Sequence, residues 1–404
     1  MNVTVSVLGR FHAFDLAREL DALGSLERLI TTYPAWAAAR FGVDRTKVAS
    51  RSEVDYVRRL GLRIGLGQYT DAWAQRRFER TAPRLLPARP DVVVAWSGVA
   101  LSTLREAKRR GATTVVERGS AHIVEQSRLL TEEYRAFGIE PRTAARSTVE
   151  RELIEYAEAD AIAVPSEFVR RTFIERGFDP ERLLVNPYGV DLSLFTPPRE
   201  GRPTDGPLRV IAAGRACLRK GTHRLIQAFE AVDHPTAELH FVGPIAAEIE
   251  PFRARIRSPR IHFHGSVPQA DLVEHYGRAH LFCLPSIEEG MAMVTFQAMG
   301  CALPCLVTPN TGAEGLVRDG HEGWIVDPGS TSALTETLAR ALEDRTELNR
   351  RGAAAAERVR AGFGWADYGA RAHALYSALR AGDALPRSPL AIPDPEVTSL
   401  GEVA

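Results

Sequence analysis

The chain contains little cysteine, no excess of either charge and no long apolar run. Only 4 of its 404 residues are cysteines, and so few thiols in a chain of this length fit a reducing compartment. Cys301 and Cys305 have no matching Cys or His pair nearby, so they do not predict a structural zinc site. Lys and Arg together number 51, as do Asp and Glu, and this balance argues against a nucleic-acid-binding protein.

Targeting and membrane segments are also missing from the pattern. No stretch approaches the roughly 18–20 apolar residues that a membrane span needs. Residues 1–8, MNVTVSVL, alternate polar and apolar side chains, which predicts a buried first strand and not a signal peptide. We therefore expect a cytoplasmic protein.

Short apolar runs alternate with longer amphipathic ones, which predicts an α/β protein with doubly wound parallel sheets. In the first half we expect strands at Val3–Leu8, Val92–Trp96, Thr113–Glu117 and Ala161–Val164, and helices at Phe14–Leu23, Leu101–Arg110 and Glu167–Arg176. Ser166 could cap the last of these helices. In the second half we expect strands at Leu208–Ala213, Glu238–Val242, Ile261–His264, Leu281–Leu284 and Cys305–Thr308, and helices at Thr222–Val232 and Trp365–Leu379.

The length suits two domains of roughly 150–200 residues each. Residues 196–207, TPPREGRPTDGP, contain four prolines and two glycines and are predicted to link the domains. We expect a first domain at 1–195, a second at 208–364, a C-terminal helix at 365–382 that could pack back on the first domain, and a disordered tail at 386–404. Two doubly wound domains in series imply a cleft at the carboxyl ends of their strands, where ligands bind in such sheets.

Two loops of the second domain are candidates for binding an anion. Gly214–Gly221, GRACLRKG, follows the first strand of that domain and offers Arg215, Arg219 and Lys220 between glycines, although a solvated basic turn would look the same. Pro285–Gly300 places Glu289 and Gly290 before a helix expected to start near Met291, and free N–H groups at a helix start suit an anion. An acidic helix start placed only for the dipole is the alternative.

Two loops of the first domain are weaker candidates. His122 lies in the loop that follows Thr113–Glu117, where it could face the cleft as a polar ligand or acid/base, although a lone histidine is more often structural. Gly9 and Arg10 follow the first strand, where a glycine lets the backbone turn tightly.

In order and combination, these segments resemble the GT4 glycosyltransferases over roughly residues 1–380. Residues 284–329 resemble the E-x7-E region of that family with its later G-x-x-E and G-x-x-G segments. Gly214–Gly221 resembles its Arg…Lys-Gly phosphate loop, and residues 185–197 resemble the strand and turn that close its first domain. The resemblance implies a GT-B fold and a retaining transfer of a sugar from a UDP- or GDP-sugar to a hydroxyl acceptor.

The resemblance also implies roles for single residues. Arg215 and Lys220, in the loop that begins at Gly214, should neutralise the diphosphate, and Glu289 should bind hydroxyls of the donor sugar. The backbone from Gly290 through Met291, Ala292 and Met293 to Val294 should meet the phosphates. Glu314 matches a later acidic position of the family, and His122 stands where the family often has a histidine near the reacting sugar.

The sequence departs from the family at two places. Gln297 replaces the usual second Glu, which holds the ribose. An amide still accepts a hydrogen bond from a ribose hydroxyl but loses a charge-assisted contribution of about 1 kcal/mol. Met291 and Ala292 replace a usual Phe-Gly pair, which alters the shape of the phosphate pocket.

The resemblance implies that the departing diphosphate takes the proton of the acceptor, so we expect no cofactor and no metal site beyond the nucleotide-sugar donor itself. The acceptor, a glycan, a lipid or a small natural product, should lie against the first domain. Residues 51–90 contain nine Arg and four acidic residues, which could contact an anionic acceptor or the inner face of a membrane, although a solvated arginine-rich face is the simpler interpretation.

Three other functions remain open. A nucleotide-sugar epimerase of the same fold would act without an acceptor, and a non-catalytic nucleotide-sugar binder would show no turnover. A dinucleotide-dependent oxidoreductase is disfavoured, because no G-x-G-x-x-G follows a strand. The oligomeric state is not predicted.

Overall fold

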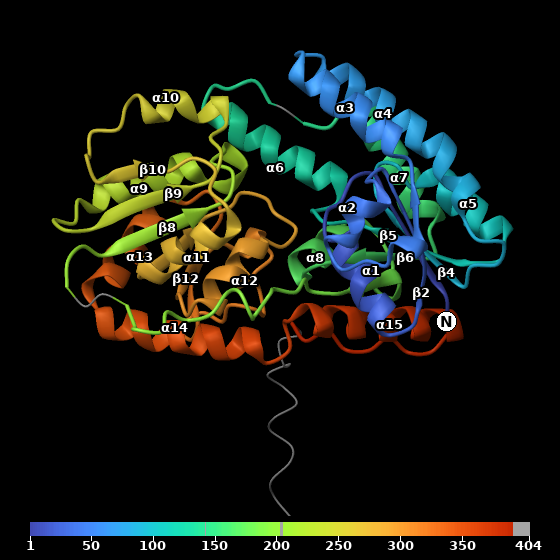
Figure 1. Ribbon diagram of the computed structural model, residues 1–404. Coiled ribbons are helices and arrows are strands. Elements are labelled where there is room, and N and C mark those ends of the chain that lie inside the picture. The colour runs from blue at the N-terminus through green and yellow to red at the C-terminus, as the bar shows by residue number, and fades with distance from the viewer. Residues whose placement is uncertain (142, 203–204, 391–404) are drawn as a thin grey trace, which may run out of the picture.

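The computed structural model describes residues 1–141, 143–202 and 205–390, which fold around two parallel sheets (Figure 1). The first sheet has the order β3-β2-β1-β4-β5-β6-β7 and comprises β1 (Val3–Val7), β2 (Leu26–Thr31), β3 (Val48–Ser50), β4 (Val92–Trp96), β5 (Thr113–Glu117), β6 (Ala161–Val164) and β7 (Leu183–Val185). The second has the order β10-β9-β8-β11-β12-β13 and comprises β8 (Arg209–Ala213), β9 (Glu238–Val242), β10 (Ile261–Phe263), β11 (Leu281–Leu284), β12 (Cys305–Val307) and β13 (Gly323–Ile325). All neighbouring strands pair in parallel.

Helices cover both sheets. We call each sheet with its helices a lobe. The first lobe, around the first sheet, contains α1 (Ala13–Ala22), α2 (Ala35–Ala39), α3 (Ser52–Arg63), α4 (Gly67–Thr81), α5 (Leu101–Arg109), α6 (Ile123–Ala136), α7 (Arg146–Glu158) and α8 (Glu167–Ile174). The second sheet is surrounded by α9 (Thr222–Val232), α10 (Glu250–Arg253), α11 (Gln269–Arg278), α12 (Met293–Gly300), α13 (Thr331–Glu343) and α14 (Arg345–Arg360), and α15 (Trp365–Ala381) ends the described helices. The predicted architecture of two doubly wound sheets is therefore confirmed.

Local sequence explains the central elements. All five residues of β4, VVVAW, are buried, as expected for a strand in the middle of a covered parallel sheet. Helix α1 buries Ala13, Leu16, Ala17 and Leu20, which follow the i, i+3, i+4, i+7 spacing of one helix face. Ser166 caps α8 as expected, because its Oγ accepts a hydrogen bond from the backbone N of Val169 at 3.3 Å.

The sequence pattern does not predict four of the strands. Glu27 and Arg28 interrupt the apolar run of β2, and β3, β7 and β13 are three residues long, too short for a periodic signal. The helix expected near Met291 starts at Met293, because Ala292 has extended dihedral angles and its N–H bonds the carbonyl of Thr311 at 3.0 Å.

The chain returns to the first lobe at its end, where α15 packs against α1 (Figure 1). Arg380 on α15 forms an ion pair with Asp91 at 2.7 Å. The tail expected at 386–404 is described as far as Leu390, which is buried, and the remainder lies outside the described residues. The domain division at 196–207, which includes the undescribed positions 203–204, stays a prediction.

The topology fixes where a ligand can bind. In a doubly wound sheet the strand order reverses at one point, and the loops on either side of it diverge and leave a crevice. That point, called the switch point, lies between β1 and β4 in the first sheet and between β8 and β11 in the second.

The described part of the chain contains no helix with the length and apolar character of a membrane span.

Candidate active site

Loops from both switch points border one cavity of about 850 Å³. The first lobe contributes the loops after β1, β4 and β5, and the second contributes the loops after β8 and β11; the lining includes Gly9, Arg10, Phe11, His12, Trp96, Glu117, Arg118, Lys220, Glu289, Met291, Ala292 and Met293. The candidate site is therefore a cleft between the two sheets.

The basic loop after β8 folds tightly against the residue that follows β11. Gly221 has a φ of +68°, and a side chain there would lie 2.0 Å from the carbonyl oxygen of Pro285, so only glycine fits. The turn Leu218–Lys220 directs Lys220 toward the loop after β11, where its Nζ lies 2.9 Å from Oε1 of Glu289. Gly214 has a φ of +99° and lies under the side chain of Lys220.

Glu289 carries its negative charge inside the protein. Burial raises the pKa of its carboxyl, but the charges of Lys220 and Arg219 outweigh burial and hold the pKa below its ordinary value. The carboxylate is therefore ionised and can accept hydrogen bonds from hydroxyl groups.

Arg215 belongs to the same cluster but is exposed. It lines a cavity of about 440 Å³ together with Arg219, Lys220 and Glu289, on the side that faces α6. Its guanidinium makes no ion pair with any residue that the structure describes, so its charge is available to a ligand. Arg219, Lys220 and Glu289 line both cavities and stand where they join.

The amino end of α12 forms another wall of the cleft, which Met291, Ala292 and Met293 line. Met293 and Arg10 also border a neighbouring cavity of about 670 Å³. Gln297, on the next turn of α12, lines this cavity too. The side-chain oxygen of Gln297 is buried and has no hydrogen-bond partner within the described parts of the chain. A buried acceptor without a partner is unusual and suggests that a ligand completes it.

Gly290 holds the lobes in contact. Its carbonyl accepts a hydrogen bond from Ser166 Oγ at 2.6 Å, across the two lobes. A β-carbon at Gly290 would lie 1.8 Å from the carbonyl oxygen of Gly119 in the first lobe, so no side chain fits between them.

An interlobe network that the sequence did not predict surrounds Glu288. Its carboxylate pairs with Arg219 at 2.8 Å and accepts hydrogen bonds from the N–H of Ala121 at 3.0 Å and the amide of Gln126 at 2.9 Å. Because Ala121 and Gln126 belong to the first lobe, this buried carboxylate fastens the closed cleft. No motif marks it, since its partners come from distant parts of the chain.

The sequence also did not predict the contact between His12 and Glu117. Nε2 of His12 lies 2.9 Å from Oε1 of Glu117, both side chains are buried, and both line the cleft. The ring of Tyr188 lies 4.2 Å from that of His12 between centroids and holds it in place. The rule that singled out Gly9 and Arg10, a loop after a strand of a doubly wound sheet, applies equally to His12.

His122 lies away from the cleft, contrary to the expectation. It is the N-cap of α6, and its Nδ1 accepts a hydrogen bond from the N–H of Val124 at 3.3 Å. Its ring packs against Tyr156 and Phe173, and it lines none of the three cavities described above. Burial, with help from the nearby charges of Arg176 and Arg118, lowers its pKa to about 4.

Glu314 is likewise outside these cavities. Its carboxylate forms an ion pair with Arg171 of α8 at 2.9 Å. The structure thus brings Gly9, Arg10, Gly214, Arg215, Lys220, Glu289, Gly290, Met291, Ala292, Met293 and Gln297 around the cleft and its neighbouring cavities, but not His122 or Glu314.

Two protein families match the chain one after the other. Residues 10–194 match the family described as "Glycosyltransferase Family 4", and residues 197–358 match "Glycosyl transferases group 1". The matches meet at the segment that joins the two sheets.

Curated relatives are distant. The chain is 29% identical over 265 residues to a D-inositol 3-phosphate glycosyltransferase of Corynebacterium glutamicum (strain R), which covers 60% of this chain and 63% of that protein. It is 26% identical over 314 residues to a GDP-mannose-dependent alpha-(1-6)-phosphatidylinositol monomannoside mannosyltransferase of Mycolicibacterium smegmatis, covering 72% and 78%. A third, a D-inositol 3-phosphate glycosyltransferase of Xylanimonas cellulosilytica, is 31% identical over 47% of this chain and 49% of its own length. The matches to two of these three relatives thus span 63% and 49% of their length, less than two thirds in each case.

Solved structures agree with the fold. HepE of Anabaena in complex with UDP superposes with a TM-score of 0.67 at 15% identity and covers 94% of this chain and 100% of that one. Sucrose-phosphate synthase from Thermosynechococcus elongatus gives a TM-score of 0.65 at 17% identity, covering 95% and 100%. The expectation of a GT-B fold is confirmed.

Proposed function

The chain belongs to the family 4, or group 1, glycosyltransferases, and from that membership we propose that it moves a sugar from a UDP- or GDP-sugar to a hydroxyl group of an acceptor. One observation carries the proposal: Arg215, Lys220 and the ionised Glu289 line one cavity, and Lys220 and Glu289 also line the adjoining cleft that the amino end of α12 borders. Cations and free backbone N–H groups suit a diphosphate, and a carboxylate suits sugar hydroxyls.

The donor is proposed to span the cleft and the two cavities that adjoin it. Its diphosphate lies beside Lys220 and the start of α12, and its sugar extends into the cleft toward Glu289. Its ribose lies beside Met293, where a hydroxyl donates to the free oxygen of Gln297. This placement is supported by shared lining residues: Arg10 and Met293 border both the cleft and the cavity of Gln297, and Lys220 borders both the cleft and the cavity of Arg215.

The transfer is proposed to retain the configuration at the anomeric carbon. The bond between that carbon and the diphosphate oxygen breaks, a bond to the acceptor oxygen forms on the same face, and the acceptor proton passes to the departing diphosphate. Arg215 and Lys220 stabilise the negative charge that develops on the leaving group, a task for which preorganised charges are effective. With these cations in place, we propose that no metal or cofactor takes part.

His12 and Glu117 line the cleft from the first lobe, whereas the basic loop belongs to the second, and we propose that they position the acceptor hydroxyl. An imidazole fixed by a carboxylate presents a defined nitrogen to its partner. The closed lobes, fastened by Glu288 and Gly290, would exclude water and so limit hydrolysis of the donor.

The hairpin of α3 and α4 is proposed to contact the inner face of a membrane from the cytoplasm. It exposes apolar side chains along its length, namely Tyr56, Val57, Leu60, Leu62, Ile64, Leu66, Tyr69 and Trp73. Exposed arginines such as Arg63, Arg76 and Arg77 accompany them, and this combination suits an anionic lipid surface. Arg58, Asp71 and Gln75 of the hairpin also line the cleft, so a lipid-linked acceptor would enter beside it.

A donor screen followed by a product assay tests the function. Thermal shifts with UDP-, GDP- and ADP-sugars should single out one nucleotide, because a ligand that binds the folded state raises its apparent stability. The selected donor, incubated alone, should yield no epimer, and with phosphoinositol or glycan acceptors it should yield a glycoside. An epimerised donor would indicate the alternative enzyme, and stabilisation without turnover on any acceptor would indicate a binding protein.

A further inference from the structure

Imidazoles gather on one face of the second sheet at its β10 edge. His240 on β9 pairs in parallel register with His262 on the edge strand β10. Glu238 lies two residues before His240, and alternate residues of a strand point to the same side of the sheet. The intervening Leu239 and the following Phe241 point into the opposite apolar core.

This face is unusual for a parallel sheet. Parallel sheets are covered on both faces and usually carry apolar side chains on each. Here the face also includes His264, which follows β10, and the covering helix α11 adds His275, whose ring centroid lies 4.6 Å from that of His264. Packing alone does not call for so many imidazoles.

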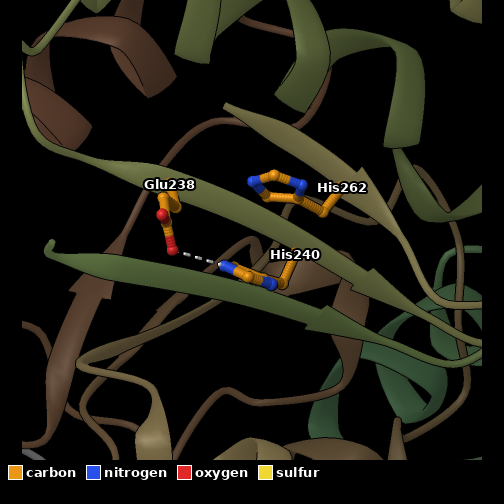
Figure 2. Close-up of side chains that lie close together, drawn as sticks. All are labelled: Glu238, His240 and His262. Atoms are coloured by element: carbon orange, nitrogen blue, oxygen red, sulfur yellow. Dashed lines mark hydrogen bonds and ion pairs between the residues drawn. The ribbon is translucent and has the colours of Figure 1, made fainter. Parts of the chain in front are cut away.

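The three side chains Glu238, His240 and His262 project from neighbouring strands toward a common region (Figure 2). Nε2 of His240 lies 3.1 Å from Oε2 of Glu238, and the ring centroids of the two histidines lie 4.9 Å apart. One ligand atom from each residue lies within 4.8 Å of the others. All three residues are half-buried and therefore within reach of solvent.

We propose that Glu238, His240 and His262 bind a divalent transition-metal ion of the Zn²⁺ class. Two imidazole nitrogens and one carboxylate oxygen form a common protein ligand set for Zn²⁺, with a water in the fourth position. At bond lengths of about 2.0–2.2 Å, tetrahedral ligand atoms lie roughly 3.3 Å apart, so ligand atoms that now lie within 4.8 Å of one another need to converge by at most about 1.5 Å. Mg²⁺ and Ca²⁺ prefer oxygen ligands and do not suit two imidazoles.

Partners beyond the three ligands orient them. Nδ1 of His240 lies 2.9 Å from Nε2 of His264, so the His240 nitrogen that is not needed for the ion has a hydrogen-bond partner of its own. Arg209 donates to Glu238 at 3.0 Å and fixes its carboxylate. Metal-binding residues are commonly held in this manner, and loss of such a partner weakens metal affinity by about 10- to 100-fold. The positive charge of Arg209 also repels a cation. Binding therefore requires all three ligands, Glu238, His240 and His262.

The site is separate from the candidate active site. None of the three residues lines the cleft or the cavities beside it. Glu238 is the first residue of β9, at the end of the sheet opposite the ligand-binding loops. An ion held there would tie the edge strand β10 to β9, so it would stabilise the second lobe and leave the chemistry of transfer unchanged.

Calorimetric titration of the untagged, EDTA-treated full chain with ZnCl₂ tests the site. Wild type should bind one ion, and the double variant His240→Ala/His262→Ala should bind at least tenfold more weakly. The variant His264→Ala should lose about 10- to 100-fold, because it removes only the partner that orients His240. His321→Ala, which removes an exposed histidine elsewhere on the second lobe, should bind like wild type, and MgCl₂ should give no binding.

Co²⁺ provides a second readout, because tetrahedral Co²⁺ absorbs strongly in the visible and octahedral Co²⁺ does not. The Co²⁺ band should appear in wild type and be absent from the double variant. If circular dichroism shows that the double variant is unfolded, the milder Glu238→Gln and His262→Gln variants should give the same losses. Equal Zn²⁺ affinity in wild type and in a folded ligand variant overturns the proposal, as does a wild type that binds no Zn²⁺.

Discussion

Nζ of Lys220 lies 2.9 Å from Oε1 of Glu289, and this ion pair joins the loop after β8 to the loop after β11. The two loops flank the switch point of the second sheet, where a ligand is expected. In the proposed binding mode, the donor exchanges this internal pair for two new contacts, with its diphosphate beside Lys220 and its sugar hydroxyls donating to Glu289. The pair therefore keeps both charges satisfied until the donor arrives, which avoids the cost of a lone buried charge.

The two histidines of the first lobe should differ in their effect on catalysis. His12 faces the cleft with Glu117, and His122 faces an aromatic cluster. We expect His12→Ala to lower kcat/KM by about 10²-fold or more, the usual contribution of a positioned acid/base or orienting group. His122→Asn, which preserves an N-cap acceptor for α6, should keep kcat/KM within about threefold of wild type. Steady-state kinetics with the identified donor and acceptor would measure both, and a larger loss at His122 would contradict the placement.

His122 should instead make the fold sensitive to acid. Burial, assisted by Arg176 and Arg118, lowers its pKa from 6.5 to about 4, so between these values the unfolded chain binds a proton that the folded chain does not. Its contribution to stability is therefore present above pH 6.5 and lost as the pH falls toward 4.

In His122→Asn this titration is absent. The urea midpoint of the variant should therefore fall less than that of wild type between about pH 7 and pH 4.5. Circular dichroism during urea unfolding at the two pH values measures the difference. Parallel declines in the two proteins would show that His122 does not titrate in this manner.

Gly290 should control closure of the lobes. In Gly290→Ala the new β-carbon would lie 1.8 Å from the carbonyl oxygen of Gly119, so the lobes must separate or the backbone must shift. We expect a fall in kcat of at least about tenfold, since misplacement of reacting groups by an ångström can cost 10²-fold.

Gly277→Ala is the matched control for this substitution. A β-carbon on this residue of α11 meets nothing closer than 3.8 Å, and alanine is the better helix former by up to about 1 kcal/mol. The control should be fully active and slightly more stable. Similar small-angle scattering profiles and activities for the two variants would contradict the closure role of Gly290.

The α3–α4 hairpin should direct binding to anionic membranes. In the double variant Leu60→Glu/Ile64→Glu two exposed apolar side chains become acidic, which removes insertion and adds repulsion. Sedimentation with vesicles of phosphatidylglycerol and phosphatidylcholine should show at least tenfold less binding than wild type. Leu23→Glu/Trp36→Glu changes two exposed apolar residues elsewhere on the first lobe and should bind normally. If both double variants bind the vesicles equally well, the α3–α4 hairpin is not the membrane-binding surface.

The sequence revealed most of the fold because its central strands are uniform apolar runs. Val92–Trp96 and Leu281–Leu284 are buried throughout and were predicted with the bounds that the structure has. Leu26–Thr31 was missed because polar residues interrupt it, although its pairing with β1 makes it a strand. Short strands at the edges of a sheet depend on their neighbours and not on their own periodicity.

The candidate site was predictable where one loop supplies several groups. Arg215 and Lys220 lie five positions apart in one turn, and Glu289 begins a recognisable segment before α12. The interlobe contacts of Glu288 and the pair formed by His12 and Glu117 depend on closure and on strand order, which no local pattern encodes. The prediction that His122 faces the cleft failed for a related reason. The loop after β5 does reach the cleft, but its last residue, His122, turns back to cap α6.

The central claim is that Arg215 and Lys220 hold the diphosphate of the donor beside the start of α12. Isothermal titration with UDP and GDP tests it most directly, compared between wild type, Arg215→Ala/Lys220→Ala and the control Arg255→Ala, which changes an exposed arginine outside the cleft and the cavities beside it. Loss of two charge-assisted contacts, each worth about 1.5–3 kcal/mol, predicts that the double variant binds the preferred nucleotide at least 100-fold more weakly while the control binds it like wild type. Equal affinity in the double variant and wild type would contradict the account.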